Sequence, residues 1–118
     1  MKLITAIVRP EELDELIPAL IDHSVRGLTV TDVRGFGQQY GHLIGATARV
    51  ADPEGGRTAV LLAKVRLDLV VLDDDAETIV EVIAKHARTE TIGDGKIWVT
   101  AVGSALRVRT GERDRAAV

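Results

Sequence analysis

Residues 62–102, LAKVRLDLVVLDDDAETIVEVIAKHARTETIGDGKIWVTAV, contain a strand, a helix and a second strand in succession, and they decide the fold class. Residues 62–72 are apolar and rich in β-branched side chains over the length of one strand. The acidic run at 73–75 caps a helix. Its apolar stripe recurs at helical spacing, on Ala76, Ile79, Val80, Ile83 and Ala87. Residues 96–102 form the next strand, and a short extended piece follows at 105–109.

The first part of the chain predicts a similar order. Residues 2–8 are typical of a buried strand, Pro10 opens a helix over 11–22, and residues 28–36 form a second strand. The apolar positions of that helix are Leu13, Leu16, Ile17, Leu20 and Ile21. Pro18 removes a backbone donor inside it, so we expect a kink there.

The order β-α-β-β-α-β predicts an α+β, ferredoxin-like fold. Such a fold has an antiparallel four-stranded sheet with two helices on one face, here with a long loop between the second and third strands. The other face of the sheet is left uncovered. Packing as a homotrimer would bury that face and bring the glycine-rich loop of one chain near elements of the next.

Composition indicates a single globular domain, residues 1–118. Hydrophobic residues make up 46%, charged residues 28%, and the formal net charge is −3, which argues against a basic nucleic-acid-binding surface. The three aromatic residues, Phe36, Tyr40 and Trp98, are too few for base stacking, and the absence of cysteine excludes thiolate metal sites. No stretch has the length or apolar character of a signal peptide or a membrane span, so we expect a cytoplasmic protein.

Residues 93–96, Gly-Asp-Gly-Lys, suit an anion. Glycines at 93 and 95 can adopt positive φ and turn successive backbone N–H groups inward, while Lys96 adds an ammonium. The loop leads into a strand, which distinguishes it from the phosphate loop of ordinary NTPases. On strand geometry Arg107 and Arg109 point to one face, where both guanidinium groups reach one polyphosphate. Taken alone, the Gly-Asp-Gly turn also fits an ordinary connection.

The segment at 37–61 is too long for a hairpin turn and holds five of the eleven glycines. Long loops in small domains are often functional or disordered. One interpretation is a mobile recognition arm that is ordered by a ligand at its base. The other is a projecting hairpin that pairs Thr47–Ala51 with Thr58–Leu62 and moves as a unit.

With these motifs in view, the chain resembles the PII signal-transduction family, trimeric cytosolic proteins that sense adenine nucleotides and nitrogen or carbon status. The resemblance covers residues 1–42 and 63–113 and rests on four motifs, TAIVRP, GLTVTDVRGFGQQYGH, ARTETIGDGKIWVT and RVRTGER. It implies a T-loop at 37–62, a B-loop at 88–96 and a C-loop at 107–113. It also implies that ATP or ADP binds in each cleft between subunits.

The resemblance assigns three sets of nucleotide-binding residues. The set that holds the phosphates is Gly93, Asp94, Gly95, Lys96, Arg107 and Arg109. The set around the adenine and ribose is Ile7, Thr29 and Val70. The set at the base of the T-loop, where it meets the phosphates, is Gly37, Gln38 and Gln39.

Members that sense 2-oxoglutarate imply an effector site at the same loop base. The glutamine that matches Gln39 helps coordinate a Mg²⁺ between the ATP phosphates and the oxo acid, and the lysine that matches Lys64 pairs with the distal carboxylate. Tyr40 and Gly41 belong to the same candidate anion site. An amide oxygen suits Mg²⁺ and an ammonium suits a carboxylate, although Lys64 is equally compatible with an ordinary charged strand residue.

The T-loop departs from the family pattern. Aligning Gly45-Ala46 with the family's Gly-Ala places Ala48 at the tyrosine that is modified in other members, and Ile44 at the arginine that plugs an ammonium channel. Arg49 takes that role only if the hairpin register differs. Gln38 stands where many members have an arginine that reaches the phosphates, which leaves the preference among ATP, ADP and AMP open.

Two regulatory functions follow from the resemblance. The first is nitrogen-status sensing through ATP or ADP, and 2-oxoglutarate where that effector binds, with the T-loop acting on a membrane transporter or an enzyme. The alternative is a carbon, bicarbonate or energy sensor that binds ADP or AMP without an oxo-acid response or tyrosine modification. Either protein would meet the membrane only peripherally, through a transporter.

An enzyme is the less favoured hypothesis. Asp94 is explained as the turn-forming residue between two glycines, and no carboxylate is evident beside a terminal phosphate, although slow nucleotide hydrolysis is compatible with a regulator. The three histidines, His23, His42 and His86, are spread along the chain and indicate surface residues rather than a metal site.

Overall fold

The computed structural model describes residues 1–37, 48–51 and 58–118. Its strands and α-helices are, in chain order, β1 (Lys2–Val8), α1 (Leu13–Asp22), β2 (Thr29–Gly35), β3 (Ala48–Ala51), β4 (Thr58–Val71), α2 (Ala76–Ala87) and β5 (Lys96–Ala101). Short 3₁₀ turns at Pro10–Glu12 and Asp73–Asp75 lead into the two helices, and a third lies at Asp114–Ala117. None of the helices in these ranges has the length and apolar character needed to cross a membrane.

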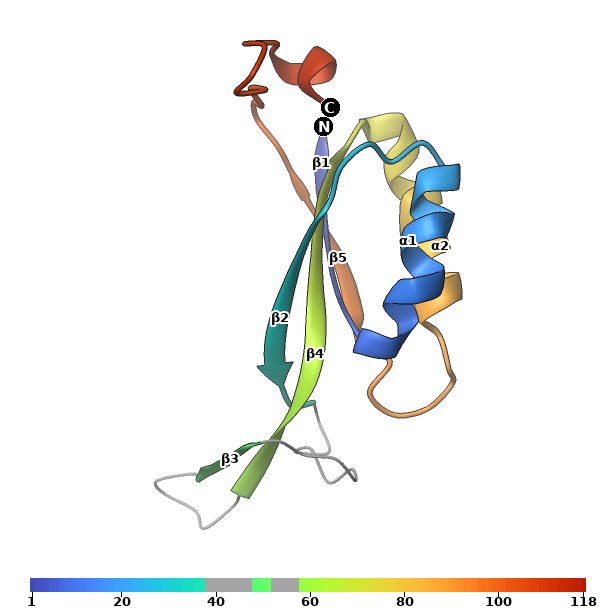
Figure 1. Cartoon of the computed structure of the whole chain (residues 1–118), viewed down its shortest axis with the longest axis vertical. Helices are drawn as coiled ribbons and strands as arrows, with labels where there is room; N and C mark the ends of the chain where they lie inside the picture. The colour runs from blue at the N-terminus through green and yellow to red at the C-terminus, as the bar shows by residue number, and fades with distance from the viewer. Residues whose placement is uncertain (38–47, 52–57) are drawn as a thin grey trace.

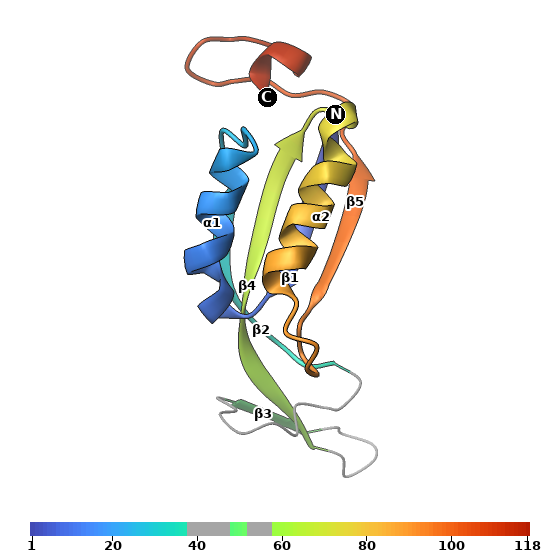
Figure 2. The same ribbon diagram turned by 90° about the vertical axis from the view of Figure 1, so that its right-hand side faces the viewer.

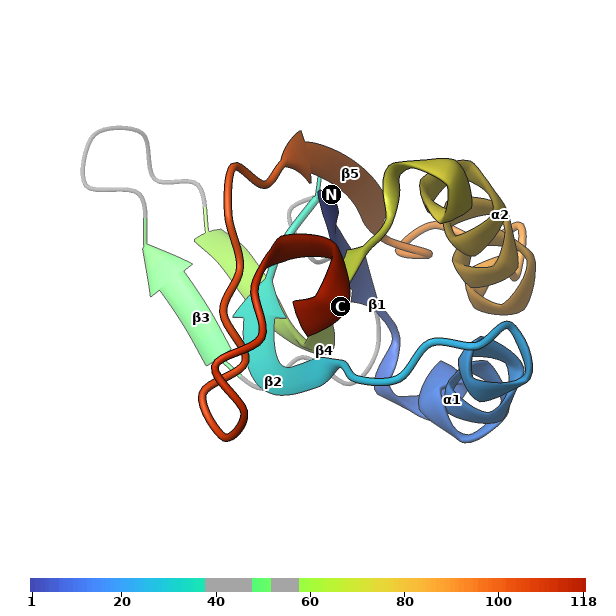
Figure 3. The ribbon, with the colours of Figure 1, turned by 90° about the horizontal axis from the view of Figure 1, so that it is seen from above.

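Four strands form an antiparallel sheet in the order β2-β4-β1-β5, and β3 pairs with the far end of β4. The two helices lie side by side on one face of this sheet (Figure 2). Figure 3, seen from above, shows the same two layers, with the C-terminal segment crossing over one end of the sheet. This is the ferredoxin-like arrangement that the order of elements predicts, so that prediction is confirmed.

The core lies between the helices and the sheet because both central strands alternate with a period of two. Ile4, Ala6 and Val8 of β1 are buried, as are Val65, Leu67, Leu69 and Val71 of β4. They pack against buried helix residues that share one face of each helix, namely Leu16, Leu20, Ile79, Val82, Ile83 and Ala87. The predicted stripe of α1 is correct at Leu16 and Leu20, whereas Ile21 is 62% exposed.

The intervening residues of β4 point to the face that the helices leave uncovered, and this face is polar at its centre. Asp68 accepts hydrogen bonds from the buried Thr5 hydroxyl at 2.7 Å and from Arg66 Nε at 2.7 Å. The contact with Arg66, together with that from Thr5, lowers the pKa of the Asp68 carboxyl. Arg66 and Asp68 therefore both stay charged on the uncovered face, whereas an apolar core would not tolerate such a pair.

The long segment between β2 and β4 contains the hairpin that was one of its two interpretations. Ala48 pairs with Leu61 and Ala51 with Thr58, so β4 begins at Thr58, four residues before the predicted strand. Residues 38–47 and 52–57 lie outside the described residues, as do the predictions made for them.

Two predictions about local structure are wrong. The side chains of Asp73–Asp75 make no capping hydrogen bond to α2; they form the 3₁₀ turn before it, and Asp73 lies 2.9 Å from the amino group of Met1. The piece at 105–109 is not a strand, because the chain turns at 108–110 and only Leu106 makes a β-bridge, to Arg113.

Pro18 offers a test of the helix energetics. α1 continues through the exposed Pro18 to Asp22, so the carbonyl of Asp14 loses the N–H that would normally bond to it. We expect Pro18→Ala to raise the free energy of unfolding by up to about 3 kcal/mol in urea denaturation at fixed protein concentration.

Pro10 is the matched control for this substitution. It occupies the first turn before α1, where a proline costs little, so Pro10→Ala should change stability by less than about 0.5 kcal/mol. A Pro18→Ala protein no more stable than the wild type would contradict this account of α1.

Candidate functional site

The glycine loop between α2 and β5 has the backbone that its sequence predicts. Gly93 and Gly95 have φ values of 98° and 100°, in the region that favours glycine. A Cβ at Gly95 would lie 1.7 Å from the carbonyl oxygen of Ile7, so only glycine allows the loop to approach β1 this closely. The next residue, Lys96, begins β5 and pairs with Ile7, which confirms that the loop leads into a strand.

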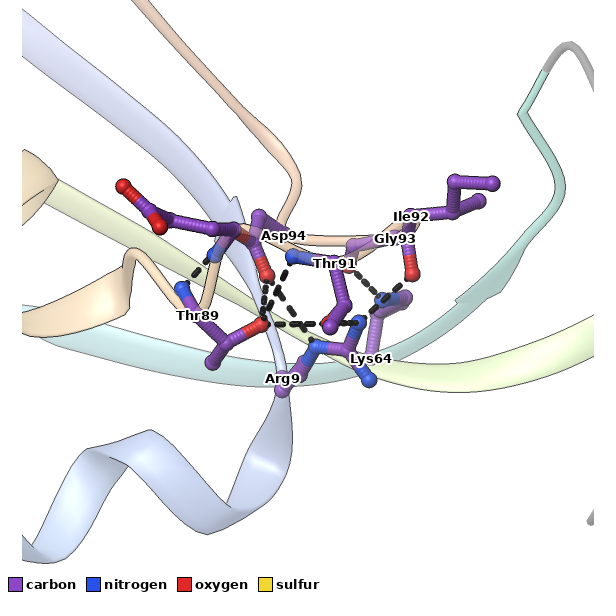
Figure 4. A network of polar contacts seen from close by, with 8 residues as sticks. Arg9, Lys64, Thr89, Thr91, Ile92, Gly93 and Asp94 are labelled. Carbon is purple, nitrogen blue, oxygen red and sulfur yellow. Dashed lines mark hydrogen bonds and ion pairs between the residues drawn. The ribbon is translucent and has the colours of Figure 1, made fainter.

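Asp94 holds the loop together (Figure 4). Its carboxylate accepts hydrogen bonds from the Thr89 hydroxyl, from the Thr89 backbone N–H at 2.8 Å and from the Glu90 backbone N–H at 2.9 Å. Arg9 Nε lies 3.4 Å from the same carboxylate; this nitrogen is buried and makes no hydrogen bond, so the ion pair balances its charge. The hydrogen bonds from Thr89 are the largest cause of the lowered pKa of Asp94.

Arg9 and Lys64 bind the other side of the loop. Arg9 Nη2 donates to the Thr91 hydroxyl at 2.9 Å and to the carbonyl of Ile92 at 2.6 Å, and Lys64 Nζ donates to the carbonyl of Gly93. Burial of Lys64, together with the nearby positive charge of Arg9, lowers the pKa of its ammonium. Two cations, Arg9 just after β1 and Lys64 on β4, thus hold carbonyl groups of the loop.

A cleft of about 430 Å³ opens between this loop and the chain leading into the T-loop segment. We call it the loop-end cleft, and its lining residues are Ile7, Gly35, Phe36, Gly37, Leu62, Lys64, Ile92, Gly93, Asp94, Gly95, Lys96 and Trp98. It therefore gathers seven of the residues that the sequence assigns to a ligand, namely Ile7, Gly37, Lys64, Gly93, Asp94, Gly95 and Lys96.

A second cleft, of about 850 Å³, lies under the C-terminal segment, and we call it the C-terminal cleft. It is lined by three further predicted residues, Thr29, Val70 and Arg107, and by Asp68. Arg109 is exposed and lines neither cleft. Because residues 108–110 form a turn, the argument from strand geometry that put Arg107 and Arg109 on one face is wrong.

The two clefts lie at opposite ends of the sheet. Lys64 and Val70 are both on β4 and on its uncovered face, six residues apart, which is about 20 Å along a strand. Figure 1 shows the glycine loop at the lower end of the sheet and the C-terminal segment at the upper end. One copy of the chain thus does not bring Lys96 and Arg107 together.

The four remaining predicted residues, Gln38, Gln39, Tyr40 and Gly41, lie outside the described residues. Within the described ranges, no group of three or more histidine, aspartate and glutamate side chains could hold a metal ion. Sequence reasoning missed Arg9 and Thr89 as parts of the site. Arg9 gives no signal in the spacing of residues, because it acts on Thr91, more than eighty residues away. Thr89 gives none because it acts through the carboxylate of Asp94.

We expect Asp94→Asn to loosen the glycine loop. Asparagine keeps one acceptor oxygen but loses the charge, so the amides of Thr89 and Glu90 should exchange with solvent roughly tenfold faster, which is about 1.4 kcal/mol. In the wild type the ionised carboxylate supports the loop above the ordinary aspartate pKa of 3.8, and this support is lost as pH falls through the lower folded-state value. The variant should lack that pH step.

Nuclear magnetic resonance of the two amides measures both effects. Asp14→Asn, at an exposed position of α1, is the control with the same charge change. Unchanged exchange at Thr89 and Glu90 in Asp94→Asn would mean that Asp94 does not order the loop.

Comparison of the sequence with known proteins identifies its family. Residues 1–112 match the model of the family described as nitrogen regulatory protein P-II. The chain is 45% identical to nitrogen regulatory protein P-II of Cereibacter sphaeroides and 40% identical to nitrogen regulatory protein GlnK of Escherichia coli, in each case over the whole of both chains. It is 43% identical to nitrogen regulatory protein P-II 2 of Methanothermobacter thermautotrophicus, over the whole chain and 97% of that protein. The chain therefore belongs to the P-II family of nitrogen regulatory proteins.

Proposed function

We propose that this P-II protein is a sensor of adenine nucleotides, and that it binds them between two copies of the chain and regulates a transporter or an enzyme through its T-loop. The observation that carries the proposal is the division of the predicted ligand residues between two clefts at opposite ends of the sheet. Each cleft holds half of the chemistry that a nucleotide needs.

The loop-end cleft supplies the phosphate half. The positive φ of Gly93 and Gly95 suits a backbone that curves around an anion, and Lys96 and Lys64 both line the cleft. The carboxylate of Asp94 also lines this cleft, but four contacts hold it within the loop. The cleft therefore favours a polyphosphate.

The C-terminal cleft supplies the nucleoside half. Val70 offers apolar surface for a base, Thr29 offers a hydroxyl, and Asp68 offers an acceptor that Arg66 and Thr5 keep ionised. Arg107 brings a guanidinium to the same cleft. Such a mixture of apolar surface with a few fixed polar groups is typical of nucleoside pockets.

A second copy of the chain would join the two halves. Each cleft includes residues of the uncovered face of the sheet, among them Trp98 in the loop-end cleft and Val70 in the C-terminal cleft, which are 40% and 37% exposed. Every interface of a closed ring such as a homotrimer joins two different patches, and we infer that these are the loop-end cleft of one copy and the C-terminal cleft of its neighbour. The site is incomplete without that neighbour.

The T-loop is the segment through which ligand binding at such a site would reach a target protein. Gly35, Phe36 and Gly37 lead into it and Leu62 leads out of it, and all four line the loop-end cleft. A ligand in the cleft thus contacts both ends of the segment and changes the population of its conformers. Ile44 stands at the family's channel-plugging arginine and Ala48 at its modified tyrosine. These differences favour a target contact without tyrosine modification.

The effector is the finer part of the proposal. In one form MgATP and 2-oxoglutarate bind together, with Gln39 on Mg²⁺ and Lys64 on the distal carboxylate. Lys64 donates to the carbonyl of Gly93, so an oxo acid would have to take its ammonium from the glycine loop. The alternative form is an energy or carbon sensor that binds ADP or AMP, or responds to bicarbonate, and ignores the oxo acid.

Nucleotide hydrolysis is the less favoured role of the site. A general base must reach an attacking water with a free carboxylate or imidazole. Among the described residues that line the loop-end cleft, Asp94 carries the carboxylate, and its oxygens already accept from Thr89 and Glu90 and pair with Arg9. Its geometry suits a structural residue.

Isothermal calorimetry tests the proposal. We expect MgATP or ADP to bind the wild type, and Lys96→Ala and Arg107→Ala each to weaken binding by about tenfold or more, since each removes a charged hydrogen-bond donor. Lys85→Ala, at an exposed position of α2, is the control for loss of a positive charge. Unchanged affinity in both cleft variants would contradict the site.

The same titrations separate the two effectors. If 2-oxoglutarate tightens the binding of MgATP and Lys64→Ala removes the effect, the oxo-acid form is supported. If 2-oxoglutarate has no effect while ADP, AMP or bicarbonate does, the sensor is of the alternative form.

A further inference from the structure

The C-terminal turn that carries Arg107 is closed by its own backbone. The Arg107 N–H donates to the carbonyl of Glu112 at 2.8 Å, and the Gly111 N–H donates to the carbonyl of Arg107 at 2.8 Å. Gly111 has a φ of 73°, and Leu106 bridges to Arg113. None of these contacts uses the side chain of Glu112.

The Glu112 carboxylate nevertheless has two fixed partners. Its Oε1 accepts from Arg107 Nη1 at 3.0 Å and from the Thr110 hydroxyl at 2.7 Å. The hydrogen bond from Thr110 and the positive charge of Arg107 lower the pKa of this carboxyl. Glu112 therefore stays ionised and contacts Arg107. Of residues 107–113, Arg107 is the arginine that lines the C-terminal cleft.

We propose that Glu112 is a positioning residue that holds the guanidinium of Arg107 in place for the bound nucleotide; this inference rests on the proposed function. A guanidinium has five N–H donors in a rigid fork. Glu112 engages one of its terminal nitrogens, through one oxygen that Thr110 also holds. The other donors stay available to a phosphate or a ribose hydroxyl.

Exposure of the pair explains why such a holder is useful. The side chains of Arg107 and Glu112 are 36% and 41% exposed, so without its partner Arg107 would sample several rotamers in water. Fixing a long side chain during binding weakens affinity by about three- to tenfold per side chain. Glu112 removes that cost before the ligand arrives, at the expense of one negative charge near the bound nucleotide.

Two substitutions of the same charge separate positioning from electrostatics. Glu112→Gln keeps an acceptor oxygen for Arg107, whereas Glu112→Ala removes it, and both take away one negative charge. In calorimetry with MgATP we expect Glu112→Ala to bind about three- to tenfold more weakly than Glu112→Gln. Glu81→Ala and Glu81→Gln, at an exposed position of α2, are the matched controls and should bind alike.

The Arg107→Ala background shows whether Glu112 acts through Arg107. There the difference between alanine and glutamine at position 112 should disappear, since the side chain that is held is gone. Side-chain resonances of the Arg107 guanidinium give a readout without ligand. They should be separate in the wild type and Glu112→Gln, and averaged by rotation in Glu112→Ala.

Several results would overturn the proposal. Equal affinities of Glu112→Ala and Glu112→Gln, or tighter binding by Glu112→Ala, would show that the carboxylate does not position Arg107. A difference that persists in Arg107→Ala would assign Glu112 to the turn instead. A wild-type protein that binds no nucleotide would overturn both this role and the proposed function, whereas binding that Arg107→Ala weakens leaves the proposed function standing whatever Glu112 does.

Discussion

The alternation of side chains along β4 is the constraint on which the rest of the structure depends. Val65, Leu67, Leu69 and Val71 are buried under the helices, so Lys64, Arg66, Asp68 and Val70 must face the other way. A shift of the register by one residue would bury three charges and expose the core. The same strand that builds the core therefore fixes the chemistry of the uncovered face, with Lys64 in one cleft and Asp68 and Val70 in the other.

Charged side chains hold the glycine loop in position. Asp94, Arg9 and Lys64 form a network that joins the loop to β1 and β4. Asp94 ties the loop to itself, while the two cations hold its outer carbonyls. Hydrogen bonds to charged groups are stronger than neutral ones, so the backbone of the proposed phosphate site is held in place without a ligand. Glu112 does for Arg107, in our proposal, what Asp94 does for the loop.

The sequence predicts the elements that depend on periodicity and the glycines that depend on φ. The strands, both helices, Gly93 and Gly95 follow from patterns of two to four residues, so they are visible along the chain. The roles of Arg9 and Glu112 are not visible along the chain. Arg9 binds Thr91 and Ile92 across the fold, and Glu112 reaches Arg107 only because the chain turns between them, where the sequence predicted an extended piece. The prediction that the acidic run at 73–75 caps the helix failed for the same reason, since the carboxylate of Asp73 pairs with the amino group of Met1 rather than with the helix.

The division of the site between two copies is the central claim, and mixing two defective proteins tests it most directly. Lys96→Ala lacks one half of each site and Arg107→Ala lacks the other half. If the site forms between copies, mixed rings contain interfaces at which both halves are intact. With random mixing at equal amounts, this holds for about a quarter of the clefts, one half times one half.

The measurement is calorimetry with MgATP on the two variants, alone and after being unfolded and refolded together. The account predicts that wild-type affinity returns in the mixture, at about a quarter of the sites. If no site of wild-type affinity appears although the chains have mixed, the two clefts do not complete one another across an interface.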